Sequence, residues 1–593
     1  MTPPGSADAQ ANVQDRRAWL EVPAADVGEA IVEALTAGGI DHLFFTSGTE
    51  IGFYQEAIAK ARALGRKAPR LVTVTHEHVG LNAALGYAAV SGRPAATAVH
   101  VDSGTQHCGG AIHTAWHSGL PVLMTAGAAP ASYPGSMPGA RDGGGHIWMQ
   151  QARDQNGIVR DFTKWDHRLE QQDNAGLVVS RALPIARTEP CGPVYLSIPR
   201  ELPLRQVSGV RFPSAGQLAI PRPPAPDPDG VQEIARRLVA ARNPFVVVSR
   251  SGRAPECVPA LVELCELLAL PVVDSNSRAY HCFPMNHPLY QRSVGLSTAD
   301  FVLVLEAAVP WLPGESEPPA EAYVAVVGVD PVQTRIPTFE FTANLRLVSD
   351  PLLAIRAITA AARALLSSTQ TTDLRQRAAH WSEASRLRAA EAERRAQAVS
   401  RKTPIDPLWL SAEIGRAIDD DCIVFDETMP QNALHEYLAC PRPGSYFYNP
   451  ASSGGWAPGA ALGAKLAAPD RPVVAVTGDG FYMFAVPNAA ISAAVRHHAP
   501  FLTIVYQNRS YSTGVTKVAK TYPGGYAARA GFDGGYFDPP IDFAKEAEAA
   551  GGYGENVSDP GEIRAALERG LEEVRGGKPA VISAWLPRLM QED

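Results

Sequence analysis

Two polar turns, each following an apolar run, carry the side chains with the clearest chemistry in this chain. Residues 473–476 are a β-branched run suited to a buried parallel strand, and a Gly-Asp-Gly turn at 478–480 ends it. A second apolar run, 501–506, begins after an Ala-rich stretch at 487–495 that favours a helix, and Gln-Asn at 507–508 follows it. Because ligands bind at the carboxyl edge of open parallel sheets, the polar residues of both turns are expected to share one site.

These residue types suit a Mg²⁺–diphosphate site. Mg²⁺ takes few protein oxygens and completes its octahedron with phosphate and water. Asp479 would supply a carboxylate oxygen, Asn508 an amide oxygen and Ser510 a backbone carbonyl. Gly478 and Gly480 would let the backbone approach phosphate closely, and the following helix would direct its first amides toward the anion. The alternative is a coincidental acidic turn.

Composition bounds the classes of function. A length of 593 residues suggests three or four domains, and 19% charged with 46% hydrophobic residues describes an ordinary globular protein. The net charge of −8 includes no basic stripe, which argues against nucleic acid. No apolar run reaches about 18 residues, so no membrane span is expected. Residues 1–17 lack a signal-peptide core, and seven scattered cysteines without a CxxC favour a reducing cytoplasm over a disulfide framework or structural zinc.

Helical and strand patterns alternate along the chain, as in α/β proteins with parallel sheets. In the first part, a Gly-rich turn is expected at 102–110. Strands are expected at 42–46, 71–75, 95–101 and 121–126, and helices at 26–37, 79–91 and 111–118.

Two linkers separate further units. Residues 213–230 are Pro-rich and predict an extended linker, and 362–402 predict an exposed helical linker. Strands of the unit between them are expected at 245–248, 301–305 and 323–327. In the last unit a strand is expected at 423–425, and the polar, aromatic loop at 517–540 is a candidate lid.

The Gly-Asp-Gly turn, followed after 26 residues by Gln507-Asn508, resembles the signature of the thiamine diphosphate (ThDP) enzymes. In that signature an Asn-Asn pair ends the motif, so Gln507 replaces the first Asn. Residues 74–94, VTHEHVGLNAALGYAAVSGRP, resemble the family's pyrimidine-domain motif. The resemblance implies that Glu77 lies against N1′ of the aminopyrimidine, while the cofactor supplies the electron-sink chemistry. The structural alternative for Glu77 is a helix N-terminal carboxylate favoured by the macrodipole.

The resemblance covers most of the chain and is closest to the acetolactate synthase-like branch, through residues 100–127, 192–203 and 521–560. It implies an α/β fold of three doubly wound parallel-sheet domains. These are a pyrimidine-binding domain at 22–203, a central domain at 231–361 and a diphosphate-binding domain at 404–593. In the family the active site lies between the first domain of one subunit and the last of another. Glu77 and Asp479 would then come from different chains of a homodimer or homotetramer.

Two positions depart from the family pattern. Gly454 stands where members place a bulky aliphatic residue that supports the bent cofactor, which makes Trp456 a candidate for that role. Gly514 stands where pyruvate decarboxylase-type members carry a Glu, which disfavours simple non-oxidative decarboxylation.

Substrate-facing candidates surround Glu77, and a His of near-neutral pKa there can carry the donor hydroxyl proton. The candidates are Thr49, Glu50, His76, His78, Gln106 and His107. Of these, Gln106 and His107 are expected, together with Glu77, to be catalytic residues. The alternative is that most of these histidines stabilise turns or are solvated. His113 and His117, four residues apart on an expected helix, allow a metal site as a further alternative.

Three functions follow from these residues and the resemblance. The first is a ThDP- and Mg²⁺-dependent carboligase or lyase acting on a 2-oxo acid or 2-hydroxyacyl donor. The second is a 2-hydroxyacyl-CoA lyase or oxalyl-CoA-like decarboxylase, for an acyl-CoA substrate. The third is a non-catalytic ThDP-binding homologue, suggested by Gly454 and Gly514. By analogy the central domain could hold FAD or a CoA nucleotide at 249–253 and 329–331, although ordinary βα turns explain these segments equally well.

Overall fold

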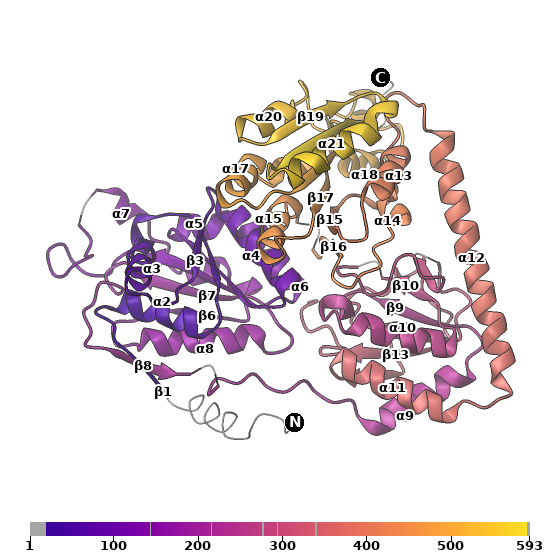
Figure 1. Ribbon diagram of the computed structural model, residues 1–593, viewed down its shortest axis with the longest axis horizontal. Coiled ribbons are helices and arrows are strands. Elements are labelled where there is room, and N and C mark those ends of the chain that lie inside the picture. Colours follow the sequence, from indigo (N-terminus) through magenta and orange to yellow (C-terminus); the bar gives the residue numbers. More distant parts are fainter. Residues whose placement is uncertain are drawn as a thin grey trace, which may run out of the picture. The chain divides into compact units, whose positions relative to one another are not determined.

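A computed structural model describes residues 19–589, apart from residues 143, 215, 276–277, 293, 338–340 and 452. Three six-stranded sheets, all parallel, carry the fold, and helices surround each of them (Figure 1). This arrangement confirms the predicted fold class. The polar N-terminal stretch 1–17 lies outside the described residues, as does Ser452 of the Gly-rich segment 452–463.

The chain divides into two compact units, one of residues up to 222 with 458–468, the other of 223–457 with 469–593. The first unit holds one sheet and an antiparallel ribbon of β1 (Trp19–Val22) and β8 (Val210–Pro213). The sheet order is β3 (Arg70–Thr73), β2 (His42–Phe45), β4 (Ala95–Val99), β5 (Val122–Ala128), β7 (Val194–Pro199) and β6 (Trp165–Arg168).

Helices cover both faces of this sheet. On one face the main core joins the strands to α2 (Val27–Ala37), α3 (Phe53–Ala63) and α8 (Ala175–Arg187). The other face carries α4 (Glu77–Ser91), α5 (Asp102–His107) and α6 (Gly109–Ser118). Short helices complete the unit: Thr49–Ile51, α7 (His146–Met149), Asn156–Ile158 and Arg160–Phe162.

The predicted Gly-rich turn at 102–110 is wrong, because most of that segment forms α5. The glycine inside it, Gly104, weakens a helix by about 1 kcal/mol in isolation, which is why the sequence favours a turn. Tertiary packing reverses that preference. A Cβ at Gly104 would lie 3.1 Å from a carboxylate oxygen of Glu77, so the missing side chain lets α5 pack against the first turn of α4.

The central sheet opens the second unit, in the order β11 (Tyr290–Arg292), β10 (Val272–Asp274), β9 (Pro244–Val248), β12 (Phe301–Leu305), β13 (Tyr323–Gly328) and β14 (Leu345–Val348). Three helices pack together beside it: α9 (Pro228–Ala240), α10 (Cys257–Leu268) and α11 (Pro351–Leu365). A short helix spans Ser251–Arg253. The predicted linker at 213–230 therefore ends inside the first turn of α9, which Asp227 caps.

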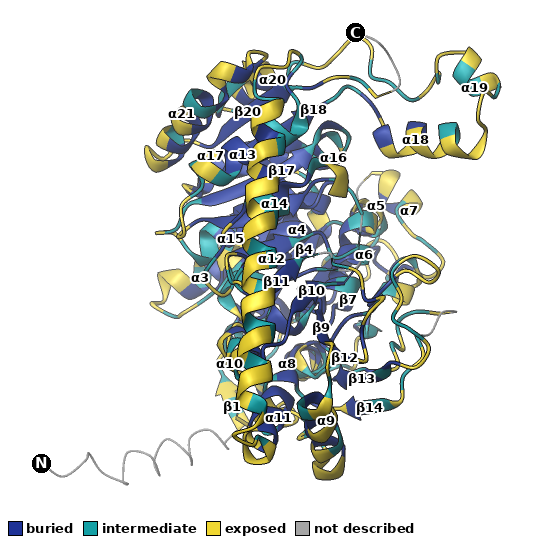
Figure 2. Ribbon diagram, turned by 90° about the vertical axis from the view of Figure 1, so that its right-hand side faces the viewer, coloured by how far each residue is buried: buried dark blue, intermediate teal, exposed yellow. Residues whose placement is uncertain are grey.

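The predicted helical linker is confirmed as α12 (Gln370–Ala398), a helix of 29 residues with only two buried residues. Figure 2 shows it as a long, mostly exposed helix with half-buried residues at intervals. Trp381 packs against the core of the central sheet, and Arg377 donates to the carbonyl oxygens of Ala241 and Leu268. These contacts fix the helix to the central domain along its first half.

The last sheet has the order β16 (Tyr446–Tyr448), β15 (Ile423–Glu427), β17 (Val473–Gly478), β18 (Leu502–Gln507), β20 (Ala580–Trp585) and β19 (Tyr553–Val557). α13 (Pro407–Ala417) packs with α21 (Ile563–Arg575), and α17 (Pro487–His497) packs with α20 (Phe543–Ala549). The remaining helices are Pro430–Asn432, α14 (Leu434–Tyr437), α15 (Ala457–Ala467), α16 (Asp479–Phe484), α18 (Ser512–Thr521), α19 (Tyr526–Arg529) and Pro560–Glu562. The candidate lid at 517–540 is thus partly helical, since it contains α19 and the end of α18.

Within the described residues, no helix combines the length and apolar character needed to cross a membrane. All seven cysteines are free and buried.

Gln507, the residue that replaces the family's Asn, joins three segments of the last domain. At the end of β18 its amide nitrogen donates to the carbonyl oxygen of Ile541 at 2.8 Å, and its amide oxygen accepts from Ser583 of β20 at 2.6 Å. The shorter Gln507→Asn side chain cannot span both partners. We expect it to lower the free energy of unfolding by about 1–3 kcal/mol, because buried polar groups lose their partners.

Thermal and urea unfolding of the Gln507→Asn variant measure this loss. The matched control is Gln232→Asn on the exposed surface of α9, expected to change stability by at most about 0.5 kcal/mol. Equal effects of the two substitutions would contradict the role assigned to Gln507.

Candidate active site

Asp479 is the first residue of α16 and lies directly after β17. Only 2% of its surface is exposed. One carboxylate oxygen accepts from the backbone N–H of Gly480 at 2.8 Å, and the other accepts from the backbone N–H of Arg509 at 2.5 Å. The two turns predicted from the sequence therefore do meet at one edge of the sheet.

Arg509 adopts a left-handed backbone with φ of +58°, and this turns its N–H toward Asp479. Its guanidinium lies over the ring of Trp585 at 4.4 Å and donates to the carbonyl oxygen of Leu586 at 3.2 Å. A cation–π contact and a hydrogen bond thus stabilise a conformation that is uncommon for a residue other than glycine. Its carbonyl oxygen accepts from the N–H of Phe537 at 2.9 Å, which brings the end of the 517–540 segment to the turn.

The side chains of the 508–512 turn form one polar network. The amide oxygen of Asn508 accepts from the N–H and the hydroxyl of Ser510 at 3.0 and 2.8 Å, and its amide nitrogen donates to the hydroxyl of Ser512 at 2.8 Å. Ser510 also pairs with Tyr536 through an isolated β-bridge. Asp479 is therefore hydrogen-bonded to the turn that holds Asn508 and Ser510, and Ser512 is a member of this turn that the sequence reasoning missed.

The geometry around Asp479 fits a divalent cation. Burial raises the pKa of its carboxyl to about 7, although backbone N–H groups of Arg509 and Gly480 favour the charged form. No ion pair with a basic side chain is found for Asp479 within the part of the chain that the structure describes. A buried carboxylate without a cation is costly, and a metal ion would supply the missing charge. A Cβ at Gly478 would meet no atom within 4 Å, so this part of the backbone has open space beside it.

A second buried carboxylate, Glu427, ends the neighbouring strand β15, opposite Thr477 of β17. Its oxygens accept from the side-chain amide of Asn449 at 2.7 Å and from the backbone N–H groups of Trp456 and Ala457 at 3.0 and 3.1 Å. Burial raises its pKa to about 7. The strand expected from the sequence ended at residue 425, just before this carboxylate. The strand-end position that singled out Asp479 was the signal that could have revealed Glu427.

The structure shows why residue 454 is a glycine and where the ring of Trp456 packs. A Cβ at Gly454 would lie 2.5 Å from the ring of Phe481, so this position has no room for the aliphatic residue of the family pattern. Trp456 is 5% exposed and its ring packs edge-on against Phe425 at 5.2 Å. The indole is therefore part of the domain core, and its proposed support of a cofactor stays a prediction.

In the first unit, Glu77 is the first residue of α4 and only 8% exposed. Its carboxylate accepts from Nδ1 of His107 at 3.1 Å. The imidazole of His76, which caps α4, stacks on that of His107 with 5.2 Å between ring centres. Burial lowers the pKa of His76, with a further contribution from His107, whereas Glu77 raises it. The structure therefore places His107, a candidate from the sequence, against the carboxylate of Glu77, and its catalytic role stays a prediction.

His76, Glu77 and His107 are also the one group of three metal-ligating side chains found among the described residues. His113 and His117 lie with their rings 4.7 Å apart, and no third ligand of that kind joins them there.

Other predicted residues are dispersed around Glu77. Gln106 is exposed on α5, and no hydrogen bond to Glu77 is found among the described residues. His78 is buried and lies 3.0 Å from the amide nitrogen of Asn82, one turn further along α4. Thr49 donates to the carboxylate of Glu50 at 2.8 Å.

Glu50 has a partner that the sequence analysis missed, His100, with which it forms a buried ion pair. Burial raises the pKa of Glu50, but hydrogen bonds from His100 and Thr49 outweigh this and leave it below its usual value. The same hydrogen bond raises the pKa of His100 against the effect of burial. His100 follows β4 directly, whereas the strand expected from the sequence ran to residue 101 and so concealed its place at a strand end.

The regions around Glu77 and Asp479 each match a known family of protein domains. Residues 25–158 match the model of the thiamine pyrophosphate enzyme N-terminal TPP binding domain, and residues 426–584 match that of the C-terminal TPP binding domain. The chain belongs to the thiamine diphosphate-dependent enzymes, as the motifs predicted. Glu77 lies in the first matched domain, and Asp479 with Asn508 lies in the second.

Relatives cover most of the chain at low identity. A benzoylformate decarboxylase of Pseudomonas aeruginosa is 27% identical over 74% of this chain and 79% of its own length. An acetolactate synthase large subunit of Mycobacterium tuberculosis is 26% identical over 94% of this chain and 95% of its own. The structure of a ThDP-dependent 4-hydroxybenzoylformate decarboxylase from Rhodococcus jostii superposes with a TM-score of 0.74 at 22% identity, covering 96% and 100% of the two chains, and supports the fold.

The raised pKa of Asp479 predicts a pH dependence of stability in the metal-free protein. Because the folded-state value of about 7 lies above that of the unfolded chain, the stabilisation by the protonated carboxyl is present below about pH 4 and is lost as the pH rises through about 7. The Asp479→Asn variant lacks this loss. We expect the wild type to lose on the order of 3 kcal/mol more than the variant across this range.

Thermal unfolding at about pH 4–8, in EDTA and without cofactor, measures the difference. Glu427 titrates in the same range in both proteins, so the comparison isolates Asp479. Added Mg²⁺ should stabilise the wild type more at about pH 8 than at about pH 6, because metal binding requires the carboxylate. Parallel pH profiles of the two proteins would rule out the assignment.

Proposed function

We propose that this protein is a ThDP- and Mg²⁺-dependent carboligase or lyase of the acetolactate synthase-like type, acting on a 2-oxo acid. The observation that carries the proposal is a buried carboxylate in each of the two matched domains, Glu77 and Asp479, both at the carboxyl ends of parallel strands. The names of two relatives support the substrate class, since benzoylformate is a 2-oxo acid and acetolactate is a product of joining two carbonyl fragments.

Asp479, Asn508 and Ser510 would hold Mg²⁺ and, through it, the diphosphate. Gly478 and Gly480 would let the backbone approach the phosphates. When bound, ThDP supplies the electron sink for making or breaking a bond next to a carbonyl. The polar network of the 508–512 turn orients the amide of Asn508 in advance, which reduces the ordering needed on binding.

Glu77 would face the aminopyrimidine. Its low exposure keeps water from the carboxylate, so a hydrogen bond to a ring nitrogen there is stronger than in solvent. Nδ1 of His107 already donates to this carboxylate, and 57% of the His107 side chain is exposed, so the imidazole can exchange protons with a bound substrate. His76, whose pKa is lowered by burial, is neutral at pH 7 and can act as a base. Gln106, on the exposed surface of α5, would contact the substrate from beside His107.

The glycine at position 514 favours carboligation or C–C cleavage over plain decarboxylation. A Cβ there would meet no atom within 4 Å, and glycine offers no proton donor for releasing an aldehyde. The proposal includes the family's arrangement in which Glu77 and Asp479 of one site belong to different chains, so that a homodimer is the smallest active form. This arrangement is inferred from the family resemblance. A measurement of the protein's mass in solution tests whether it forms a dimer.

The contacts in two turns of the central domain do not distinguish an acyl-CoA or FAD site from ordinary turns. In the turn at 249–253, Arg253 lies 3.6 Å from Glu306, and Gly252 packs against the carbonyl of His281. In the second turn, Asp330 accepts from the N–H and hydroxyl of Thr334. These contacts are those of ordinary βα turns.

The decisive test is Glu77→Gln, which keeps size and polarity while removing the charge. With ThDP and Mg²⁺, the wild type should convert at least one member of a panel of 2-oxo acids, with products identified by mass. The variant should lose about 10²–10⁴-fold in kcat, the range for removing a proton-handling group. Calorimetric titration should show ThDP still bound, because the diphosphate contacts are unchanged.

A matched control is Glu56→Gln, an exposed acid in the first turn of α3, which should leave kcat unchanged. Wild-type protein that binds ThDP yet turns over no 2-oxo acid would support the non-catalytic homologue instead. Full activity of the Glu77→Gln variant would refute the role given to this carboxylate.

A further inference from the structure

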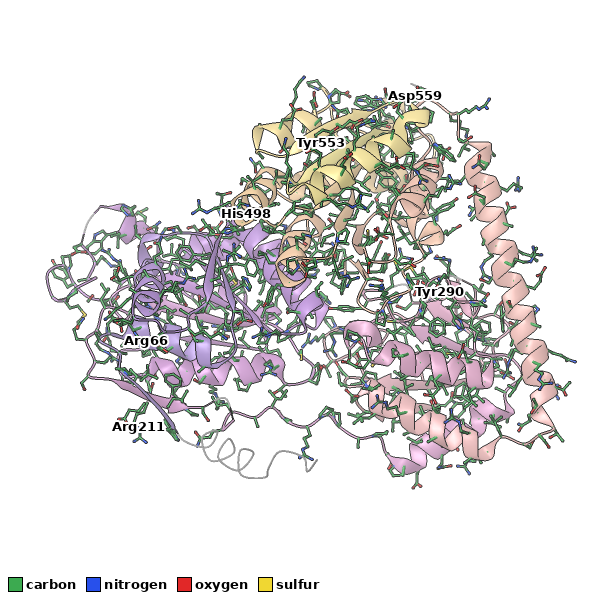
Figure 3. All side chains as sticks on the ribbon, viewed as in Figure 1. Arg66, Arg211, Tyr290, His498, Tyr553 and Asp559 are labelled. Atoms are coloured by element: carbon green, nitrogen blue, oxygen red, sulfur yellow. The ribbon has the colours of Figure 1, made fainter. Side chains whose placement is uncertain are left out.

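A cavity of about 590 Å³ lies in the second compact unit, away from both turns of the diphosphate site. Its walls come from the edge strand β11 and the loop before it, the second half of α12, and the segment from α14 to residue 439. Tyr290 of β11, labelled in Figure 3, lies beside α12 at this edge of the central sheet. The volume falls within the range of roughly 300–1,000 Å³ that small-molecule sites occupy.

Two arginines in the wall have no carboxylate partner. Arg292 donates to backbone carbonyls, those of His435 and Met285, the latter at 3.2 Å. Arg388 of α12 donates to the carbonyl of Tyr290 at 3.4 Å. Neither guanidinium forms an ion pair among the residues that the structure describes.

The other charges of the wall neutralise one another or a neighbour. Arg395 pairs with Glu436, and Glu391 pairs with Arg394. Arg292 and Arg388 thus have no ion-pair partner among the described residues, and the arginines of the wall outnumber its glutamates. Burial lowers the pKa of Arg388 and the charge of Arg292 lowers it further, while the carboxylate of Glu436 raises it, so the two cations act on each other.

The backbone conformation of Arg292 indicates that its side chain is held in a fixed position at the cavity wall. Its φ of +57° is left-handed, a conformation that costs a bulky residue of the order of 1 kcal/mol and persists only where the surroundings impose it. The guanidinium contacts two carbonyl groups of the following domain, those of His435 and, at 3.5 Å, Leu438, and one of its own domain, that of Met285. The fold therefore holds this cation rigidly at the cavity wall.

We propose that this cavity binds a small molecule that carries a phosphate monoester, with its phosphate within reach of Arg292 and Arg388. A phosphate monoester has about two negative charges at pH 7 and neutralises both guanidiniums with one group, whereas a single carboxylate leaves one uncompensated. Planar guanidinium groups suit bidentate contact with phosphate oxygens.

The rest of the ligand would fill the remaining space. Bare phosphate is far smaller than 590 Å³, so an organic body is needed to use the cavity. Met285, Val294 and Leu438 offer apolar contact for it, while Asn286 and Gln291 offer polar groups. The ligand would touch the central domain, α12 and the last domain together, so its binding should raise the unfolding temperature.

Binding is tested by calorimetry on the holoenzyme, saturated with ThDP and Mg²⁺ so that the diphosphate site cannot take up the probe. The probes are adenosine 5′-monophosphate and glucose 6-phosphate, with adenosine, glucose, citrate and inorganic phosphate as comparisons. At least one monoester should bind once per chain, and its uncharged counterpart should not bind. Arg388→Gln should weaken that binding by about tenfold or more, as expected for losing a charged hydrogen bond.

Arg386→Gln is the matched control, because Arg386 lies on the same helix, outside the cavity wall, and pairs with Glu383. Its affinity should stay within about twofold of the wild type, a difference well under 1 kcal/mol.

A second pair of variants keeps every charge. Ala389→Trp would fill the cavity from α12 and should abolish binding of the monoester, whereas Ala390→Trp, at an exposed neighbouring position outside the wall, should not. This pair tests whether the monoester binds in the cavity even if the Arg388→Gln variant fails to fold. Absence of binding by both monoesters, binding of inorganic phosphate without either ester, equal binding of citrate, or retention of binding by Ala389→Trp would each overturn the proposal.

Discussion

The hydrogen bond from the backbone of Arg509 to the buried carboxylate of Asp479 is the contact on which the last domain's site depends. It joins the ends of β17 and β18, two neighbouring strands that α16 and α17 separate along the chain. The bond requires a left-handed residue at 509, and the stacking of that side chain on Trp585 stabilises the conformation. The returning segment at 535–537 then pairs with the same turn. One buried charge thus organises three segments that are distant in sequence.

The same physical arrangement recurs at Glu77 and Glu427. Each carboxylate sits at the carboxyl end of a parallel strand, buried, with N–H donors or an imidazole but no ion pair with Lys or Arg among the described residues. Burial favours the protonated form of Asp479 and Glu427. Carboxylates held this way are poised for a ligand that brings a positive charge or a hydrogen-bond donor. Their burial at strand ends supports the cofactor-binding roles proposed for Glu77 and Asp479.

Much of the architecture could be read from the sequence because its signals are local. Apolar runs of four to six residues predicted strands in all three sheets, and the Ala/Arg/Glu-rich stretch predicted α12. The segment at 102–110 was misjudged because its helix depends on Gly104 packing against Glu77, a tertiary contact that overrides propensity. The partly helical nature of 517–540 was missed because aromatic and glycine residues obscure its short helices.

The candidate site was found only in part for a similar reason. Asp479, Asn508 and Glu77 carry motifs with fixed spacing, so the sequence identified them without the fold. His100 and Glu427 carry no motif, and their roles arise from partners, Glu50 and Asn449, that the folded sheets bring to them. Gln507 shows the limit most directly, since its replacement of the family's Asn only makes sense beside Ser583 and Ile541.

By itself, the sequence determined the family, the order of the domains and the residues that carry the motifs, because local spacing and apolar periodicity encode these features along the chain. The fold alone reveals which carboxylates are buried, which histidines lie beside them, and that Arg292 and Arg388 line one cavity without an ion pair of their own among the described residues. The physical reason is that burial and electrostatic partners are set by contacts between segments far apart in sequence, and no local pattern records those contacts.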